Sequence, residues 1–183
     1  VVPLQPYRKD KTMPVAMIDD RVLPYEELGP AYMDRGLFFG DGVYEVVRSY
    51  SGRMFALDEH LKRMTNGLAA LKIHNVDMAA VRNRIERAFE RASIADAKIY
   101  FHVTRGSAER EHNWHDGLKP NFLLTVTPLS HEPGLREDGV AVCTHPDLRW
   151  KRCDIKSLNL LPNVLAKHAA AEKGCFEAVL VSE

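Results

Sequence analysis

Apolar residues recur along the chain with two different periods, which together predict a mixed α/β protein. Between residues 57 and 92 they return every three or four positions, as expected of two amphipathic helices. The two stripes consist of Leu61, Met64, Leu68 and Leu71, and of Val81, Ile85, Ala88, Phe89 and Ala92. Asp58 and Asp77 come just before these stripes, so we expect both aspartates to act as helix N-caps.

Short runs of β-branched and aromatic residues predict strands between and after these helices. The runs cover residues 15–18, 21–23, 43–50, 54–56, 99–103, 122–126, 140–144 and 176–181. The first two form a hairpin around Asp19 and Asp20, and Ser51 with Gly52 turns the third run into the fourth. Pro162 suits the first turn of a further helix, which ends near Lys173 because Gly174 follows.

A segment without periodicity divides the chain into two parts. Residues 128–134 contain two prolines and a glycine, which is typical of a linker. We therefore expect an N-terminal α/β domain over residues 1–128, a linker over 129–136 and the start of a second domain over 137–183. Two strands and one helix cannot bury a core of their own, so we expect the natural protein to continue by roughly one small domain.

Composition excludes several classes of function. Lysine plus arginine and aspartate plus glutamate each number 25, so bulk charge gives no reason to expect nucleic-acid or membrane-surface binding. No apolar run approaches the ~20 residues of a membrane span. The three cysteines lack the spacing of a metal site, and their odd number favours reduced thiols in a cytoplasmic protein.

Two motifs in the first half of the chain contain residues that could carry chemistry. Residues 35–45, RGLFFGDGVYE, place glycines on both sides of an aspartate, which predicts a tight turn before a strand and lacks the spacing of a phosphate loop. Arg63 lies in the early turns of the first helix. It is either a solvated surface arginine or a phosphate clamp, since a guanidinium group offers bidentate donors.

Two further motifs follow in the second half. Arg110 and His112 stand two residues apart, and in an extended segment this spacing points both side chains to one face, where they would suit a carboxylate. A polar surface loop is the alternative. Lys156 lies between Ile155 and a leucine-rich run. Most lysines are solvated, but one among apolar residues can have a lowered pKa and act as a Schiff-base nucleophile.

In this order, the motifs resemble the class IV (fold type IV) pyridoxal-phosphate aminotransferases. The family's N-terminal signature resembles RGLFFGDGVYEVVRSYSGRMFALDEHLKRM, and its substrate-side strand and loop resemble YFHVTRGSAEREH. The segment around its cofactor lysine resembles RWKRCDIKSLNLLPNVLAKHAAAEKGCFEAVLV. The resemblance covers nearly the whole chain from about Val15, and it implies the two-domain fold type IV architecture with an incomplete second domain.

The resemblance also implies roles for particular residues. Lys156 corresponds to the lysine that forms the Schiff base with pyridoxal 5'-phosphate, and Arg63 to the arginine that holds the cofactor phosphate. Tyr44, Arg110 and His112 are similar to the group that binds the substrate α-carboxylate in the D-amino-acid branch. The implied reaction is transamination of D-alanine-like donors with 2-oxo acids such as 2-oxoglutarate or pyruvate. The implied assembly is a homodimer with its cofactor sites near the subunit interface.

Some features of the family pattern are different here or leave alternatives. Arg35 and Glu45 belong to the same signature, and we expect structural roles for them. The family pattern continues with a Thr-Glu-Gly-Ser-type and a Gly-Ile-Thr-Arg-type segment, which this chain lacks, so we expect an incomplete site. The alternatives are a branched-chain L-amino-acid aminotransferase, an aminodeoxychorismate lyase, and a non-catalytic fragment or binding module.

Overall fold

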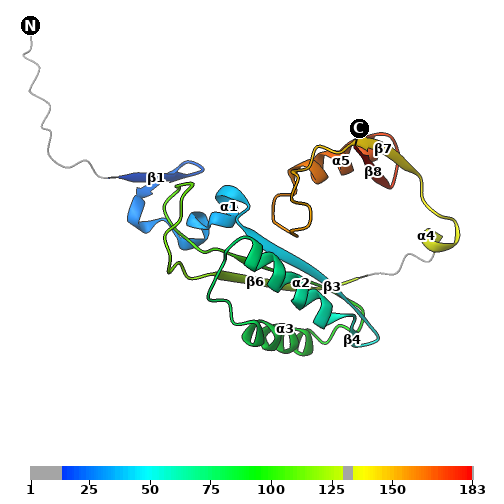
Figure 1. The fold of residues 1–183 in the computed structure, drawn as a ribbon, viewed down its shortest axis with the longest axis horizontal. Coiled ribbons are helices and arrows are strands. Elements are labelled where there is room, and N and C mark those ends of the chain that lie inside the picture. The colour runs from blue at the N-terminus through cyan, green and yellow to red at the C-terminus, as the bar shows by residue number, and fades with distance from the viewer. Residues whose placement is uncertain (1–13, 130–133, 183) are drawn as a thin grey trace, which may run out of the picture.

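The computed structural model describes residues 14–129 and 134–182, which form strands and helices in mixed order (Figure 1). The strands are β1 (Val15–Ile18), β2 (Arg21–Pro24), β3 (Gly42–Tyr50), β4 (Arg53–Met54), β5 (Ala97–Thr104), β6 (Asn121–Pro128), β7 (Val142–Pro146) and β8 (Glu177–Val181). The helices are α1 (Arg35–Phe39), α2 (Leu57–Ala70), α3 (Met78–Ala92), α4 (Gly134–Glu137) and α5 (Leu161–Glu172), with 3-10 turns η1 (Tyr25–Glu27) and η2 (Pro30–Met33). The predicted α/β character and the β1–β2 hairpin are confirmed.

An antiparallel sheet in the order β4-β3-β5-β6 forms the centre of the N-terminal part. Along β3 the side chains alternate between two faces: Val43 and Val47 are buried, whereas Val46 is exposed. Helices α2 and α3 lie over the buried face (Figure 1). Their apolar stripes pack against Ile99, Phe101 and other buried residues of β5. The opposite face of the sheet carries Tyr44, Val46, Tyr100 and His102.

The helix caps agree with the sequence at one helix and differ at the other. Asp77 caps α3 as predicted, because its carboxylate accepts hydrogen bonds from the backbone N–H groups of Ala79 and Ala80 at 2.9 and 3.1 Å. The prediction for Asp58 is wrong. Ala56 occupies the N-cap of α2 with φ 52°, and Asp58 lies in the first turn, where its carboxylate pairs with Arg82 of α3.

Two arginines and one aspartate form a buried ion cluster beside the start of β3. Asp41 Oδ2 accepts hydrogen bonds from Arg35 Nε at 2.9 Å and from Arg105 Nε at 2.8 Å, and Asp41 Oδ1 accepts one from Arg105 Nη2 at 3.0 Å. Arg35 and Arg105 are only 3% and 5% exposed. The predicted turn lies where the glycines flank Asp41, with Gly40 at φ 65°, and the five residues before it form helix α1, which the sequence did not predict.

Helix α5 and the parallel pair β7–β8 form the C-terminal group. Strand β7 begins two residues later than predicted, whereas α5 has Pro162 in its first turn and Gly174 after its end, as expected. The predicted linker lies partly outside the described residues, and residues 134–137 form α4. Val179 and Val181 of the apolar strand β8 are 46% and 49% exposed.

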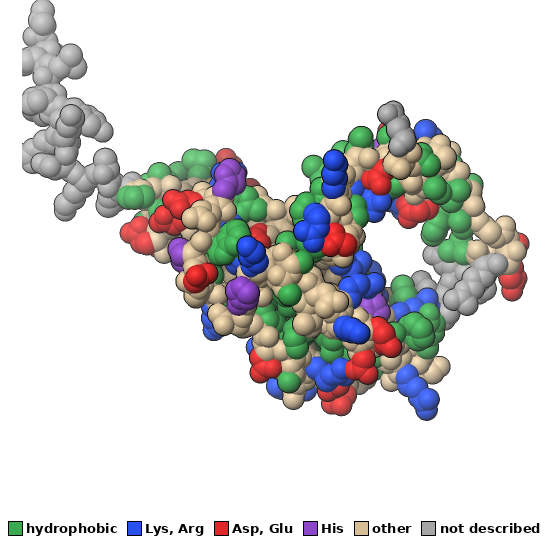
Figure 2. Space-filling model, viewed as in Figure 1, with side chains coloured by type: hydrophobic (Ala, Val, Ile, Leu, Met, Phe, Trp, Pro, Cys, Tyr) green, Lys and Arg blue, Asp and Glu red, His purple; other side chains and the backbone are tan. Residues whose placement is uncertain are grey.

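Positively and negatively charged side chains are interspersed on the face shown in Figure 2, in keeping with the zero formal net charge.

Within residues 14–129 and 134–182, no helix combines the length and apolar character that crossing a membrane requires.

The buried cluster gives a prediction about stability. We expect Asp41→Asn to lower the free energy of unfolding by about 3–5 kcal/mol, because two buried guanidinium groups then lack their counter-charge. Asp58→Asn is the matched control: it breaks an exposed ion pair with Arg82 and should cost less than about 1 kcal/mol. Urea unfolding of both variants checks this, and equal losses would contradict the importance of the cluster.

Candidate active site

Lys156 is held at the edge of the sheet by backbone pairing. The N–H of Tyr44 donates to the carbonyl of Lys156 at 3.0 Å, and the N–H of Leu158 donates to the carbonyl of Gly42 at 3.1 Å. The segment therefore runs antiparallel to the start of β3, with a bridge between Val43 and Ser157. In such an extended segment successive side chains point to opposite faces. Ile155 and Ser157 are buried accordingly, and Lys156 is half-buried.

The amine of Lys156 lies against an aromatic ring on the outer face of the sheet. Its Nζ atom is 4.2 Å from the centroid of the Tyr44 ring. Tyr44 in turn lies 5.9 Å from the ring of Tyr100, whose hydroxyl is 2.9 Å from His102 Nδ1. Burial lowers the pKa of His102 and raises the pKa of Tyr100 relative to their ordinary values. Both groups are therefore neutral near pH 7, and they lie beside Tyr44 on the face of the sheet where the lysine amine lies.

Arg63 is fixed by a buried carboxylate on the other face of β3. Its Nε and Nη2 atoms donate to Glu45 Oε1 and Oε2, both at 2.6 Å, and His60 Nδ1 lies 2.8 Å from Oε2. Burial by itself would raise the pKa of Glu45, but the hydrogen bonds from Arg63 and His60 hold it below its ordinary value. Glu45 is fully buried, whereas the Arg63 side chain is 52% exposed.

The unengaged part of Arg63 faces an open pocket. Its Nη1 atom has no hydrogen bond to any described residue, because the Glu45 and His60 contacts use Nε and Nη2. The pocket has a volume of about 270 Å³ and is lined by Glu59, Lys62, Arg63, Asn66, Gly67, Ala70, Asp154 and Ile155. Ile155 immediately precedes Lys156, so a cationic anchor and the half-buried lysine lie on the two sides of one short segment.

Arg110 and His112 meet at one ring, although their segment is not a strand. The guanidinium carbon of Arg110 is 5.4 Å from the centroid of Phe39, and the His112 ring lies at the same centroid distance. Both side chains contact the same ring, but from a bent loop rather than the extended segment that the prediction assumed. That ring belongs to helix α1.

The predicted residues fall into two groups that do not touch within one chain. Tyr44 contacts Lys156 and Tyr100, whereas Arg110 and His112 contact Phe39. Among the residues that the structure describes, no hydrogen bond or ring contact joins these groups. The predicted carboxylate-binding group of Tyr44, Arg110 and His112 is thus not assembled by a single copy.

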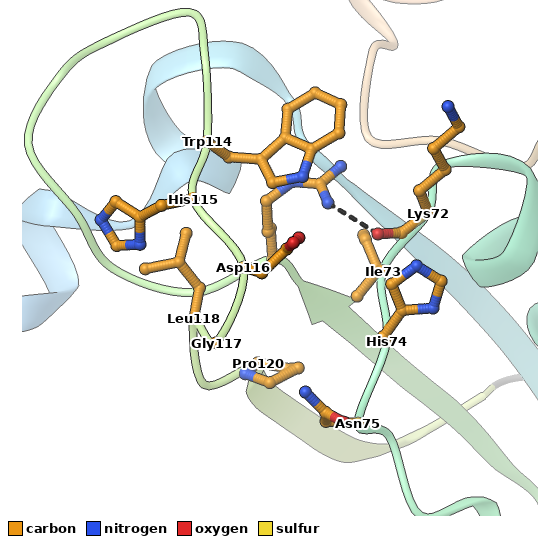
Figure 3. Close-up of a pocket in the computed structure, with 11 residues that line it drawn as sticks. Lys72, Ile73, His74, Asn75, Trp114, His115, Asp116, Gly117, Leu118 and Pro120 are labelled. Carbon is orange, nitrogen blue, oxygen red and sulfur yellow. Dashed lines mark hydrogen bonds between the residues drawn. The ribbon is translucent and has the colours of Figure 1, made fainter.

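A second pocket lies beside the end of α2 and has room for nothing larger than water molecules (Figure 3). In the close-up, Trp114, His115 and Asp116 come from a loop that faces Lys72 and His74, and the dashed line marks the hydrogen bond to the Lys72 carbonyl. The donor is Arg105, whose guanidinium carbon lies 4.0 Å from the Trp114 ring centroid. The pocket measures about 30 Å³, the space of one or two water molecules. Its role is structural.

Sequence reasoning did not single out His60 and Phe39, and it gave Glu45 a structural role without naming its partners. The alternation along β3 places Glu45 on the inward face, and a buried acid there requires a partner. His60 and Arg63 lie three residues apart, which places them on one face of a helix. These two patterns could have indicated that His60 and Arg63 bind Glu45. Phe39 gave no such signal, because its neighbours come from a loop more than seventy positions later.

Comparisons with known proteins identify the family to which the chain belongs. The model of the amino-transferase class IV family matches residues 42–183, which include Lys156, Arg63 and the Arg110 loop. D-alanine aminotransferase of Bacillus licheniformis is 38% identical over 168 residues, which are 91% of this chain and 59% of that protein. The chain therefore belongs to the class IV aminotransferases, and it spans about three fifths of the length of this relative.

Solved structures place the fold in the same group. The PLP-bound form of a hypothetical aminotransferase from Mycobacterium tuberculosis superimposes with a TM-score of 0.71 and 24% identity, over 92% of this chain and 61% of that one. A 4-amino-4-deoxychorismate lyase from Pseudomonas aeruginosa superimposes with a TM-score of 0.70 and 26% identity, over 82% and 56% of the two chains. The fold is thus that of the fold type IV enzymes.

The lowered pKa of Glu45 gives a prediction about pH. A carboxyl whose pKa is lower in the folded state contributes stability above its unfolded pKa, and this contribution is lost as pH falls through the folded value. We expect Glu45→Gln to be about 2 kcal/mol less stable than the wild type at pH 7, since it loses two charge-assisted hydrogen bonds. The difference should shrink below the ordinary pKa of 4.5.

Denaturant unfolding of both proteins between pH 7 and pH 3 checks this expectation. Asp154→Asn is the control, because that exposed carboxylate pairs with exposed Arg152. A stability difference for Glu45→Gln that stays constant over the whole range would show that the charge on Glu45 does not matter.

Proposed function

We propose that the complete native protein is a pyridoxal-phosphate-dependent aminotransferase that acts on D-amino acids and 2-oxo acids. The observation that supports this most strongly is the position of Lys156. Its amine lies on the Tyr44 ring at the edge of β3, and the next residue back lines the pocket of Arg63. D-alanine donors, with pyruvate or 2-oxoglutarate as acceptor, fit the relatives' names and the cationic pair in the 110–112 loop.

The residues present fit the cofactor. Arg63 would hold its phosphate, since its side chain lines an open pocket, Nη1 has no hydrogen bond to a described residue, and the rest of the guanidinium group is held by Glu45. Lys156 would bind its aldehyde carbon. When bound, the cofactor supplies a ring that withdraws electrons from the substrate Cα. Once the substrate amine has taken its place on the aldehyde carbon, Lys156 Nζ would take the proton from Cα as general base and deliver it, as general acid, to the carbon that had carried the aldehyde.

The substrate carboxylate requires donors, and we assign these to Arg110, His112 and Tyr44. A guanidinium group and an imidazole on one ring present converging N–H donors, and the Tyr44 hydroxyl adds a third. Pinning the carboxylate decides which face of Cα is turned to Lys156, and thereby selects the enantiomer.

Because the loop pair does not touch Tyr44 in one chain, we propose a homodimer that brings the two groups together. The outer face of the sheet offers a surface for this, since Val46 and Leu123 are 37% and 47% exposed beside Tyr44 and His102. Sedimentation equilibrium of the complete protein would give the molecular mass that decides the point.

The alternatives differ in what they would produce. An aminodeoxychorismate lyase would release pyruvate from aminodeoxychorismate without an amino acceptor. A branched-chain enzyme would react with L-leucine and not with D-alanine. A non-catalytic module would show no absorption band of bound cofactor. The arginine and the histidine on Phe39 favour a small substrate held chiefly by its carboxylate, which agrees best with the D-amino-acid reaction.

Replacing the lysine tests the central assignment. We expect Lys156→Ala in the complete native protein to lower the transamination rate by at least about a thousandfold, since both the covalent anchor and the general base are lost. Lys151→Ala, an exposed lysine of the same loop, should keep the wild-type rate. The rate of pyruvate formation from D-alanine and 2-oxoglutarate measures both, and an active Lys156→Ala protein would refute the assignment.

Replacing the arginine tests the carboxylate assignment. We expect Arg110→Ala to raise KM for D-alanine by about tenfold or more and to reduce the preference for D- over L-alanine, because a charge-assisted hydrogen bond to the carboxylate is lost. Arg91→Ala, an exposed arginine of α3, is the control. An unchanged D/L ratio of kcat/KM in Arg110→Ala would exclude the role.

A further inference from the structure

We propose that Arg35 is a positioning residue that sets where Arg110 and His112 stand, so that helix α1 determines how the substrate carboxylate is held. This inference rests on the proposed function, because it gives the Arg110–His112 loop its role. Arg35 does not itself need to touch the substrate. It acts through the backbone of the loop.

The contacts of Arg35 run to three consecutive carbonyl groups of that loop. Nη1 donates to the carbonyl of Glu111 at 2.6 Å and to that of Asn113 at 3.2 Å, and Nη2 donates to that of His112 at 3.1 Å. The carbonyls of Glu111 and His112 belong to the two peptide groups on either side of His112 Cα. Holding both fixes the backbone from which His112 projects, and it begins at the residue that directly follows Arg110.

The same helix supplies the ring on which both side chains rest. Phe39 lies four residues after Arg35, so the two residues are on the same side of this single turn. The guanidinium carbon of Arg35 is 4.9 Å from the Phe39 centroid, while Arg110 and His112 each lie at 5.4 Å. Helix α1 therefore holds the backbone of the loop through Arg35 and contacts its side chains through Phe39.

Helix α1 is itself held rigidly against the sheet. A methyl group at Gly36 would lie 2.5 Å from Thr104 Cγ2, which shows how closely α1 packs on β5. The N–H of Arg35 donates to the carbonyl of Gly106 at 2.9 Å, and Asp34 accepts a hydrogen bond from the Gly36 N–H at 2.6 Å. A helix can position another segment only if it is itself fixed, and these contacts fix α1 against β5 and the segment that follows it.

Arginine suits position 35 because all three of its side-chain nitrogens donate hydrogen bonds, which use four of its five N–H groups. Nε binds Asp41, and the two terminal nitrogens bind the three carbonyls. Lysine would keep the charge, but its single ammonium group cannot span carbonyls on both sides and Asp41 at the same time. Arg35→Lys therefore loosens the loop without creating an uncompensated acid.

Arg105 provides a matched control inside the same cluster. It is equally buried and also binds Asp41, but its remaining donors go to the carbonyls of Leu71 and Lys72 at the end of α2. Arg105→Lys thus removes a comparable buried arginine without releasing the carbonyls of the loop. A merely structural role for Arg35 would make the two variants behave alike.

The experiment uses the complete holoenzyme with Arg35→Lys, Phe39→Leu, Arg105→Lys and Arg110→Ala. Propionate serves as the probe, because it carries the carboxylate without an amine, and its inhibition constant against D-alanine reports carboxylate binding alone. Hydrogen exchange of the amides of residues 109–113 reports the loop independently of activity. We expect Arg35→Lys and Phe39→Leu to raise the propionate inhibition constant by about tenfold or more, to speed exchange, and to leave kcat nearly unchanged.

The outcomes separate this inference from the proposed function. If Arg110→Ala weakens propionate binding and Arg35→Lys does not, or if Arg35→Lys and Arg105→Lys have equal effects on it, the positioning role is wrong and the function stands. If Arg110→Ala leaves propionate binding unchanged, the loop does not bind the carboxylate and both fail. Should Arg35→Lys not fold, Phe39→Leu decides by the same measurements.

Discussion

One carboxylate, Asp41, sets the position of two buried guanidinium groups, and the candidate site is arranged around them. A buried charge costs several kcal/mol unless it is paired and hydrogen-bonded. Arg35 and Arg105 share this single acid, so the second positive charge is met by backbone dipoles instead. Five carbonyl groups accept their remaining hydrogen bonds, three in the 111–113 loop and two at residues 71 and 72. Because both arginines also pair with Asp41, the 111–113 loop and the end of α2 are both held next to this carboxylate.

The alternation of a β-strand separates the two halves of the proposed chemistry. Tyr44 and Glu45 are neighbours on β3, yet one faces the lysine and the other faces α2. The segment around Lys156 pairs with the same edge and follows the same alternation, so Ile155 faces the Arg63 pocket and Lys156 faces Tyr44. The proposed phosphate anchor, Arg63, and the proposed reactive amine, Lys156, are thus set on opposite sides of one edge by a period of two residues.

Local patterns predicted the elements well, whereas the contacts of the site were beyond them. Periodicity and capping chemistry gave α3 with its Asp77 cap, because these signals act within one helical turn. Asp58 failed as a cap because an arginine on another helix takes its carboxylate. Helix α1 was missed because five residues carry little periodic signal and its stability comes from contacts such as Arg35 to Glu111, which are 76 residues apart. The site residues were found through a family resemblance, and their partners Glu45, His60 and Phe39 only through the structure.

The side chains of the candidate site are held to different degrees, and the difference fits the role proposed for each. Arg63 donates two hydrogen bonds to Glu45, and Arg35 donates four to Asp41 and the loop, so each guanidinium group is held before any ligand arrives, which lowers the entropy cost of binding. Lys156 has no such brace: its backbone is pinned by Tyr44, but its amine has only a ring beside it. In the proposed reaction the lysine amine must leave one carbon atom and take a proton from another, which requires a fixed backbone and a mobile amine. Lys156 has both, whereas the guanidinium groups of Arg35 and Arg63, which are proposed to position or bind other groups, are immobilised.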